Sequence, residues 1–223
     1  MGEPSFMIRQ IKEKIDLGFS CLKLKIGALN FDHELGILKQ IRKKFSPNNL
    51  EIRVDANGSF HAKDALNKII ELSKYKIHSI EQPIETNQLK ELKLLCKSTP
   101  IPVALDEELI KIRDDNEKKR LIEYVRPNYL ILKPSLLGGF KQTNKWIDIA
   151  ENMDIKWWIT SALESNIGLN AIAQFCAEFQ LELPQGLGTG NLYNNNFQSP
   201  LTLNGEMLSY DNDKKWDLKH LFE

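Results

Sequence analysis

Five charged side chains stand where short apolar runs end, and their types suit a metal-dependent proton-transfer site. They are Lys25, Asp55, Glu81, Asp106 and Lys133. The three carboxylates come from consecutive runs, so neighbouring parallel strands would bring them together, where they would repel one another strongly. A hard divalent cation with oxygen ligands removes that repulsion. We therefore predict that Asp55, Glu81 and Asp106 bind Mg²⁺, with Mn²⁺ as an alternative.

The two lysines would flank this cluster and face each other across a bound substrate. Lys23 lies two residues before Lys25 and so shares a strand face with it. A lysine that is crowded by a second lysine and a metal, and partly removed from water, can act as a base near neutral pH. This arrangement suits removal of a proton next to a carboxylate, because the metal neutralises the charge that develops. We predict Lys25 and Lys133 as catalytic residues.

Each charge also has a purely structural interpretation. A Lys-x-Lys pair in a strand is usually a solvated face, and a lone Asp at a strand end is usually a helix cap or turn former. Lys133-Pro134 could simply mark the end of a strand. These interpretations would require five independent coincidences at one rim, so the catalytic interpretation is favoured when the five residues are taken together.

Seven short apolar runs alternate along the chain with longer segments of helical periodicity. In 64–72, for example, apolar residues recur three and four positions apart. The first helix is expected to begin with Ser5 as N-cap and to end at Gly18. Strands separated by helices pair in parallel through right-handed crossovers. The predicted strands are 21–26, 51–56, 79–83, 102–107, 129–134, 157–161 and 183–188.

The spacing of the runs favours a (β/α) barrel over an open sheet. From Lys25 to Ser161, the residues that end successive runs are 30, 26, 25, 27 and 28 positions apart, and each unit of a barrel spans the same wall height. No Gly-x-Gly-x-x-Gly turn follows an early strand. Alternation places the Leu, Ile and Val side chains toward the helices and the charges inward, at the carboxyl mouth where barrel active sites lie.

The number of strands predicts an incomplete (β/α) barrel. The chain opens directly into a helix, so the predicted strands number seven where a complete barrel has eight. We expect a barrel catalytic domain over 1–190, holding strands two to eight. A C-terminal tail follows over 191–223, with two short strands at 201–203 and 207–210.

The composition is that of a globular α/β protein and argues against several other classes. The 30 basic and 30 acidic side chains among 223 residues give a net charge of zero, which offers no footprint for nucleic acid or an anionic membrane. No apolar run approaches the roughly 18 residues of a membrane span, and no signal peptide is visible. The three cysteines match neither a disulfide framework nor a zinc site. We expect a cytoplasmic protein that binds a small carboxylate substrate.

Taken together, the motifs resemble those of the enolase superfamily over nearly the whole chain. A lysine on the sixth barrel strand, with no histidine at the seventh, is similar to the muconate lactonizing subgroup. Thr160-Ser-Ala-Leu-Glu-Ser-Asn-Ile-Gly168 resembles the seventh-strand segment of the o-succinylbenzoate synthases. The Asp-x-Asp of dipeptide epimerases is replaced by Gly186-Leu-Gly-Thr-Gly190. The other motifs are Lys23-Leu-Lys25, Val54-Asp-Ala-Asn57, Ile80-Glu-Gln-Pro83, Ala104-Leu-Asp-Glu107 and Leu132-Lys-Pro134.

The resemblance implies a role for each charged residue. Asp55, Glu81 and Asp106 would be the Mg²⁺ ligands. Lys25 would abstract the proton and then assist departure of hydroxide, while Lys133 would stabilise the enediolate from the opposite face. The implied reaction is syn dehydration of 2-succinyl-6-hydroxy-2,4-cyclohexadiene-1-carboxylate to 2-succinylbenzoate, a step of menaquinone biosynthesis. The family also carries an N-terminal α+β capping domain and a first barrel strand. Both are absent here and are expected from the full-length protein.

The resemblance also implies that Lys23 supports the substrate carboxylate and lowers the pKa of Lys25. Arg53 and Asn57 are weaker candidates. Both are expected to face the mouth, where each could simply hydrogen-bond a metal ligand.

Ser161 and Gly168 are the remaining substrate-binding candidates. The segment that they delimit leads into an apolar helix, and exposed N–H groups at a helix start attract anions such as a succinyl carboxylate. The alternative is a plain strand-to-helix turn capped by Ser165 or Asn166.

Two other functions remain open. An N-acylamino acid racemase or dipeptide epimerase of the same superfamily would use Lys25 and Lys133 as two bases on opposite faces. The missing Asp-x-Asp counts against the epimerase. The second alternative is an inactive truncated fragment, against which the five intact charged positions argue.

Overall fold

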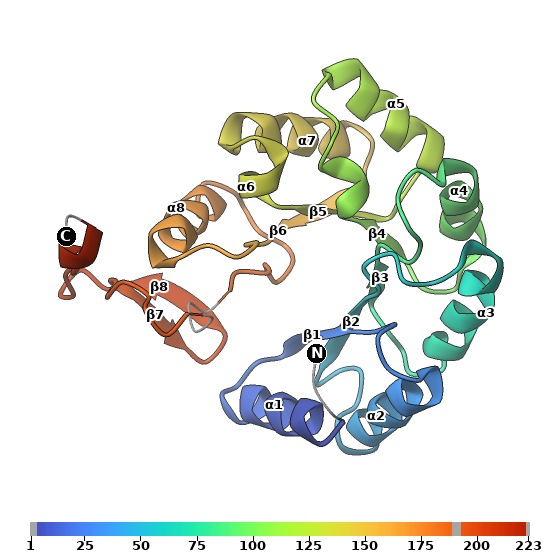
Figure 1. Ribbon diagram of the computed structural model, residues 1–223, viewed down its shortest axis with the longest axis horizontal. Helices are drawn as coiled ribbons and strands as arrows, with labels where there is room; N and C mark the ends of the chain where they lie inside the picture. Colours follow the sequence, from blue (N-terminus) through green and yellow to red (C-terminus); the bar gives the residue numbers. More distant parts are fainter. Residues whose placement is uncertain (1–3, 189–192, 222–223) are drawn as a thin grey trace.

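The computed structural model describes residues 4–188 and 193–221, which form an incomplete (β/α) barrel (Figure 1). Six parallel strands lie side by side in chain order, as predicted, and each is followed by at least one helix. The strands are β1 (Cys21–Lys25), β2 (Glu51–Asp55), β3 (Ser79–Glu81), β4 (Val103–Leu105), β5 (Tyr129–Leu132) and β6 (Lys156–Ile159).

The longer α-helices line the outer face of the curled sheet (Figure 1). Among the described residues, no helix is both long and apolar enough to cross a membrane. The α-helices are α1 (Pro4–Asp16), α2 (Phe31–Lys44), α3 (Ala62–Ser73), α4 (Leu89–Ser98), α5 (Asp115–Val125), α6 (Pro134–Leu137), α7 (Phe140–Asn152) and α8 (Asn166–Cys176), and the two 3₁₀ helices are η1 (Glu107–Leu109) and η2 (Lys219–Leu221).

Strand alternation separates two hydrophobic layers. Leu22 and Leu24 of β1, with their counterparts on the other strands, belong to the large core between sheet and helices. A small second cluster lies inside the barrel and contains Ala104, Ile131 and Trp158. The charged residues share this inner face, so the predicted inward direction of the charges is confirmed.

Two details of the predicted elements are wrong. Ser5 is not an N-cap, because α1 already includes Pro4, whose fixed φ and missing N–H suit a first helical turn. The helix does end before Gly18, as predicted, and Gly18 adopts a left-handed φ of 90°.

The run 183–188 is the second difference, because it forms a single parallel bridge, Thr160 to Gly186, in place of a strand. Pro184 in this run cannot donate to a ladder. Within the described part of the chain, no strand pairs with the other side of the run, and the outer edge of β1 has no strand partner. The barrel therefore has a seam between β1 and the run 183–188.

The predicted tail strands are confirmed as an antiparallel hairpin of β7 (Leu201–Asn204) and β8 (Met207–Tyr210). The tail contacts both sides of the seam. The Ser20 backbone N–H, just before β1, donates to Glu206 Oε2 at 2.9 Å. On the other side, the Asn166 backbone N–H of α8 donates to Asn196 Oδ1 at 2.8 Å.

Candidate active site

The parallel register of the strands delivers the charged side chains to one rim. Lys25, Asp55 and Glu81 are direct neighbours across β1, β2 and β3. Asp106 follows β4 as the N-cap residue of η1, and Lys133 follows β5 as the N-cap residue of α6. The structure therefore brings together all five residues that the spacing of the runs singled out.

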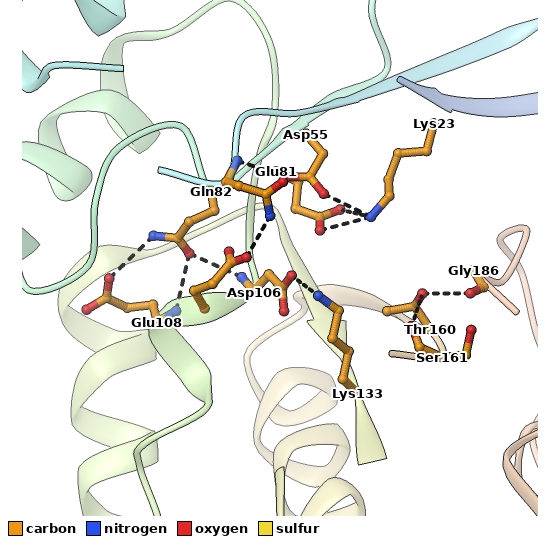
Figure 2. A network of polar contacts seen from close by, with 12 residues as sticks. Lys23, Asp55, Glu81, Gln82, Asp106, Glu108, Lys133, Thr160, Ser161 and Gly186 are labelled. Atoms are coloured by element: carbon orange, nitrogen blue, oxygen red, sulfur yellow. Dashed lines mark hydrogen bonds and ion pairs between the residues drawn. The ribbon is translucent and has the colours of Figure 1, made fainter. Parts of the chain in front are cut away.

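The carboxylates are removed from water, and ammonium groups hold them (Figure 2). Asp55, Glu81 and Asp106 are at most 2 % exposed. The Lys23 ammonium lies 3.0 Å from both Asp55 Oδ2 and Glu81 Oε1. Lys25 Nζ lies 2.5 Å from Asp55 Oδ2, and Lys133 is paired with Asp106.

Burial and the ion pairs shift the pKa of each of these groups in opposite directions. Burial would raise the pKa of Asp55, but the Lys23 and Lys25 ammonium groups, with a hydrogen bond from Glu81, lower it to about 2. Burial raises the pKa of Glu81 well above its ordinary value; Lys23 opposes this shift, whereas Asp55 and Asp106 add to it. Burial lowers the pKa of Lys23, but Glu81 and Asp55 outweigh it and raise that pKa. Burial therefore outweighs the Lys23 ion pair at Glu81, whereas the ion pairs outweigh burial at Asp55.

The donor set suits a hard divalent cation, although its present arrangement is an ion-pair network. Over residues 4–188 and 193–221, no group of three or more His, Cys, Asp or Glu side chains is placed to hold a metal ion. Three converging carboxylates, one with a strongly raised pKa, are the oxygen ligands that such a cation prefers. Binding would require Lys23 and Lys25 to withdraw from Asp55, since both contact Oδ2 of that carboxylate.

Asn57 and Arg53, the two weaker candidates, lie in different places. Asn57 is at the mouth, where its backbone N–H donates to Asp55 Oδ1 at 3.0 Å. Arg53 lies deeper in the barrel. Its guanidinium sits 4.0 Å from the Trp158 ring and donates to the Pro184 carbonyl at 2.9 Å. The expectation that Arg53 faces the mouth is wrong, because its Nε pairs with Glu51 Oε1 at 2.7 Å, toward the amino end of β2.

Comparison with known proteins adds to this geometry. A model of the enolase C-terminal domain-like family matches residues 7–210. The chain belongs to the enolase superfamily. It is 51 % identical over 208 residues to an o-succinylbenzoate synthase of Desulfotalea psychrophila, covering 93 % of this chain and 56 % of that protein. It is 30 % identical over 180 residues to a hydrophobic dipeptide epimerase of Enterococcus faecalis, and the match covers 79 % of this chain and 49 % of that protein.

Solved structures of superfamily members agree with the fold. The crystal structure of MenC from Desulfotalea psychrophila superposes with a TM-score of 0.88 at 50 % identity, covering 94 % of this chain and 58 % of that one. A muconate lactonizing enzyme from Pseudomonas putida has a TM-score of 0.82 at 23 % identity, covering 92 % and 57 %, which shows the fold alone. The chain spans about half the length of the curated relatives that it matches.

Gln82 is a residue of this site that the sequence analysis did not identify. It is buried directly after Glu81, and its Oε1 accepts hydrogen bonds from the backbone N–H groups of Asp106 and Glu108, each at 3.3 Å (Figure 2). Its Nε2 donates to the Ile84 carbonyl at 3.1 Å. Gln82 thus connects the end of β3 to the turn that carries Asp106. The signal was its place in the Ile80-Glu-Gln-Pro83 motif.

Ser161 and Gly168 lie on the other side of the mouth but are not brought together. Ser161 Oγ accepts from the Gly188 N–H at 2.7 Å, beside the Thr160–Gly186 bridge. Gly168 lies in α8, where an added Cβ would come within 2.9 Å of Glu164 Cβ. Gly168 therefore makes room for Glu164, whose carboxylate pairs with Ser135.

The first N–H of α8 is already satisfied. The backbone N–H of Asn166, the first residue of α8, donates to the side-chain amide oxygen of Asn196 in the tail. Ser165 occupies the N-cap position without a side-chain hydrogen bond, so the tail, and not the predicted Ser165 or Asn166 side chain, supplies the cap.

Proposed function

We propose that this chain forms the barrel of an o-succinylbenzoate synthase that acts in menaquinone biosynthesis in the cytoplasm. The reaction would be syn dehydration of 2-succinyl-6-hydroxy-2,4-cyclohexadiene-1-carboxylate to 2-succinylbenzoate. The observation that carries the proposal is the rim of two lysines flanking three buried carboxylates, in a chain 51 % identical to a protein of that name.

Lys25 and Lys133 come from β1 and from the end of β5, so they approach a substrate at the mouth from different sides. Lys25 would remove the proton next to the substrate carboxylate and return it to the departing hydroxide on the same face, which makes the elimination syn. Lys133 would hold its charge against the oxygens on the opposite face. Lys23 would bind the substrate carboxylate once it leaves Asp55 and Glu81.

Asp55, Glu81 and Asp106 would hold Mg²⁺, or Mn²⁺ in its place. When bound, the cation would neutralise the negative charge that develops on the substrate carboxylate. The carboxylates must be ionised for this; the low pKa of Asp55 favours ionisation, whereas the raised pKa of Glu81 opposes it until a cation is bound. Ser161, with the segment that ends at Gly168, would form the opposite wall, where the succinyl group would lie.

The test is an assay of 2-succinylbenzoate formation with Mg²⁺. The chain should be measured alone and joined to the part of the Desulfotalea psychrophila relative that lies outside the match, because the active site of this superfamily also needs a capping domain. Activity that appears in the joined protein and is lost with chelator is the expected result. Absence of activity in a soluble, folded joined protein would favour an inactive fragment.

A second candidate is an N-acylamino acid racemase or dipeptide epimerase, favoured by the 30 % identity to the Enterococcus faecalis epimerase. Such an enzyme needs both lysines as bases. In the Lys133→Ala variant, a racemase would still exchange the proton on the Lys25 face but would no longer interconvert the two enantiomers. A synthase would lose dehydration by about 10²- to 10³-fold through lost charge stabilisation. Racemisation of an N-succinyl amino acid faster than dehydration would replace the synthase assignment.

A further inference from the structure

A chain of hydrogen bonds leads from Glu107 through Asn57 to Lys25. Lys25 Nζ donates to Asn57 Oδ1 at 2.6 Å. Asn57 Nδ2 donates in turn to Glu107 Oε1 at 2.7 Å. The three residues come from the ends of β1 and β2 and from η1 after β4, so the chain crosses the rim beside the carboxylates.

The direction of this chain is fixed by chemistry. An ionised carboxylate only accepts hydrogen bonds, so Glu107 requires the Asn57 amide to turn its NH₂ group toward it. The amide oxygen then points at the Lys25 ammonium, which only donates. The Asn57 backbone holds the side chain in place, because its N–H is bound to Asp55 and its φ of 43° is a left-handed conformation that asparagine tolerates.

The other oxygen of Glu107 argues against a purely stabilising role. Glu107 Oε2 is buried and has no hydrogen-bond partner in the described part of the chain. A buried carboxylate oxygen without a partner lowers stability. Glu107 therefore contributes little to the stability of the fold. What it provides is a fixed hydrogen-bond acceptor for Asn57.

We propose that Glu107 is a positioning residue that orients the Lys25 ammonium through Asn57. The inference rests on the proposed function, in which Lys25 is the base. Without Glu107 the Asn57 amide is free to rotate, and the Lys25 ammonium, which also contacts Asp55, loses the second acceptor that fixes its direction.

The test compares two Glu107 variants in the full-length protein. Glu107→Ala removes the acceptor and should lower kcat by about 10- to 100-fold with KM changed by less than about two-fold. Glu107→Gln keeps a carbonyl oxygen for Asn57 and should restore kcat to within about three-fold. Glu91→Ala, the same change at an exposed site on α4, is the matched control.

Asn57→Ala breaks the same chain at its middle. It should lower kcat about as much as Glu107→Ala, and the double variant should be no slower than Asn57→Ala alone, because two residues of one chain are not additive. Additive losses would mean that the two residues act separately, which contradicts the proposal.

A readout without turnover separates this inference from the proposed function. Labelling of Lys25 by an amine reagent, relative to Lys133 in the same molecule, is measured by peptide mass spectrometry. The ratio should change by about three-fold or more in Glu107→Ala and remain at the wild-type value in Glu107→Gln. A changed ratio in a protein without synthase activity would overturn the function and keep the orientation. An unchanged ratio, or an unchanged kcat in an active protein, would overturn the inference.

Discussion

The two sides of the barrel mouth are held together in different ways. On one side, β1 to β5 pair in register, and each of the five predicted site residues, Lys25, Asp55, Glu81, Asp106 and Lys133, has an ionic partner. On the other side, the run 183–188 is joined to the barrel by one bridge and by hydrogen bonds that involve side chains: Arg53 to the Pro184 carbonyl, the Ile159 N–H to Gln185, and the Gly188 N–H to Ser161. The proposed chemistry is therefore built on paired strands, while the wall that would contact the rest of the substrate is held by loops.

Removing the base on the paired side should have the largest effect. Lys25→Ala should lower dehydration by about 10⁴-fold, since one group serves as both base and acid. The measurement is 2-succinylbenzoate formation in the full-length protein with Mg²⁺. Continued exchange of the substrate α-proton with solvent deuterium in this variant would contradict the role of Lys25.

The seam should be the weakest part of the chain when it is produced alone. β1 and α1 line a groove of about 380 Å³, in which apolar side chains such as Phe6, Met7 and Leu24 lie among Gln10 and the lysines of both elements. Exposed strand edges and apolar grooves promote association. Residues 1–223 should therefore self-associate in light scattering, with little dehydratase activity. Adding the part of the Desulfotalea psychrophila relative that lies outside the match should reverse both. A monomeric chain with full activity would contradict this.

Neutralising one carboxylate of the rim should stabilise the metal-free protein. The pKa of Glu81 is raised in the folded state, so its contribution to stability is fully present below the ordinary value of 4.5 and is lost as the pH rises through the folded pKa. At neutral pH the burial of this carboxyl group therefore costs stability. Glu81→Gln should raise the free energy of unfolding by about 0.5–2 kcal/mol in chelator, while removing most metal-dependent activity.

Asp55→Asn is the matched control for this prediction. The pKa of Asp55 is lowered to about 2, so its contribution is present above the ordinary value of 3.8 and is lost only as the pH falls through the folded pKa. Asp55→Asn should therefore destabilise the protein at neutral pH. Thermal unfolding in chelator measures both variants, and shifts of the same sign would show that the two carboxylates do not differ as described.

Much of the paired side could be predicted from the sequence, and less of the seam side. The regular spacing of the charged residues from Lys25 to Lys133 predicted the strands and their order, because parallel pairing through helices repeats one geometry. Strand alternation predicted the inward direction of the charges. Arg53 could not be placed by alternation alone, since its position depends on Trp158 and on a carbonyl 131 residues away. The run 183–188 was predicted as a strand because apolar content does not reveal whether a pairing partner exists.

Two glycines give a further comparison, one at the bridge on the seam side and one inside α2 on the paired side. A Cβ at Gly186 would lie 2.5 Å from Thr160 Oγ1, so Gly186→Ala should break the bridge and lower the free energy of unfolding by about 1–3 kcal/mol. Gly36, inside α2, has nothing within 4 Å of an added Cβ, so Gly36→Ala should raise it by about 0.5–1 kcal/mol. Chemical denaturation measures both, and equal effects would mean that the bridge contributes nothing.

Arg53 ties the two sides together from within. Its guanidinium reaches from β2 to the Pro184 carbonyl and covers the Trp158 ring on the way. Any widening of the barrel must lengthen that hydrogen bond or uncover the indole, and indole emission responds to the charge and water around it. The chain holds four tryptophans, so replacing the other three would leave Trp158 as the only source of indole fluorescence. Its emission would then report the separation of β2 from the run 183–188 in solution, without an added probe.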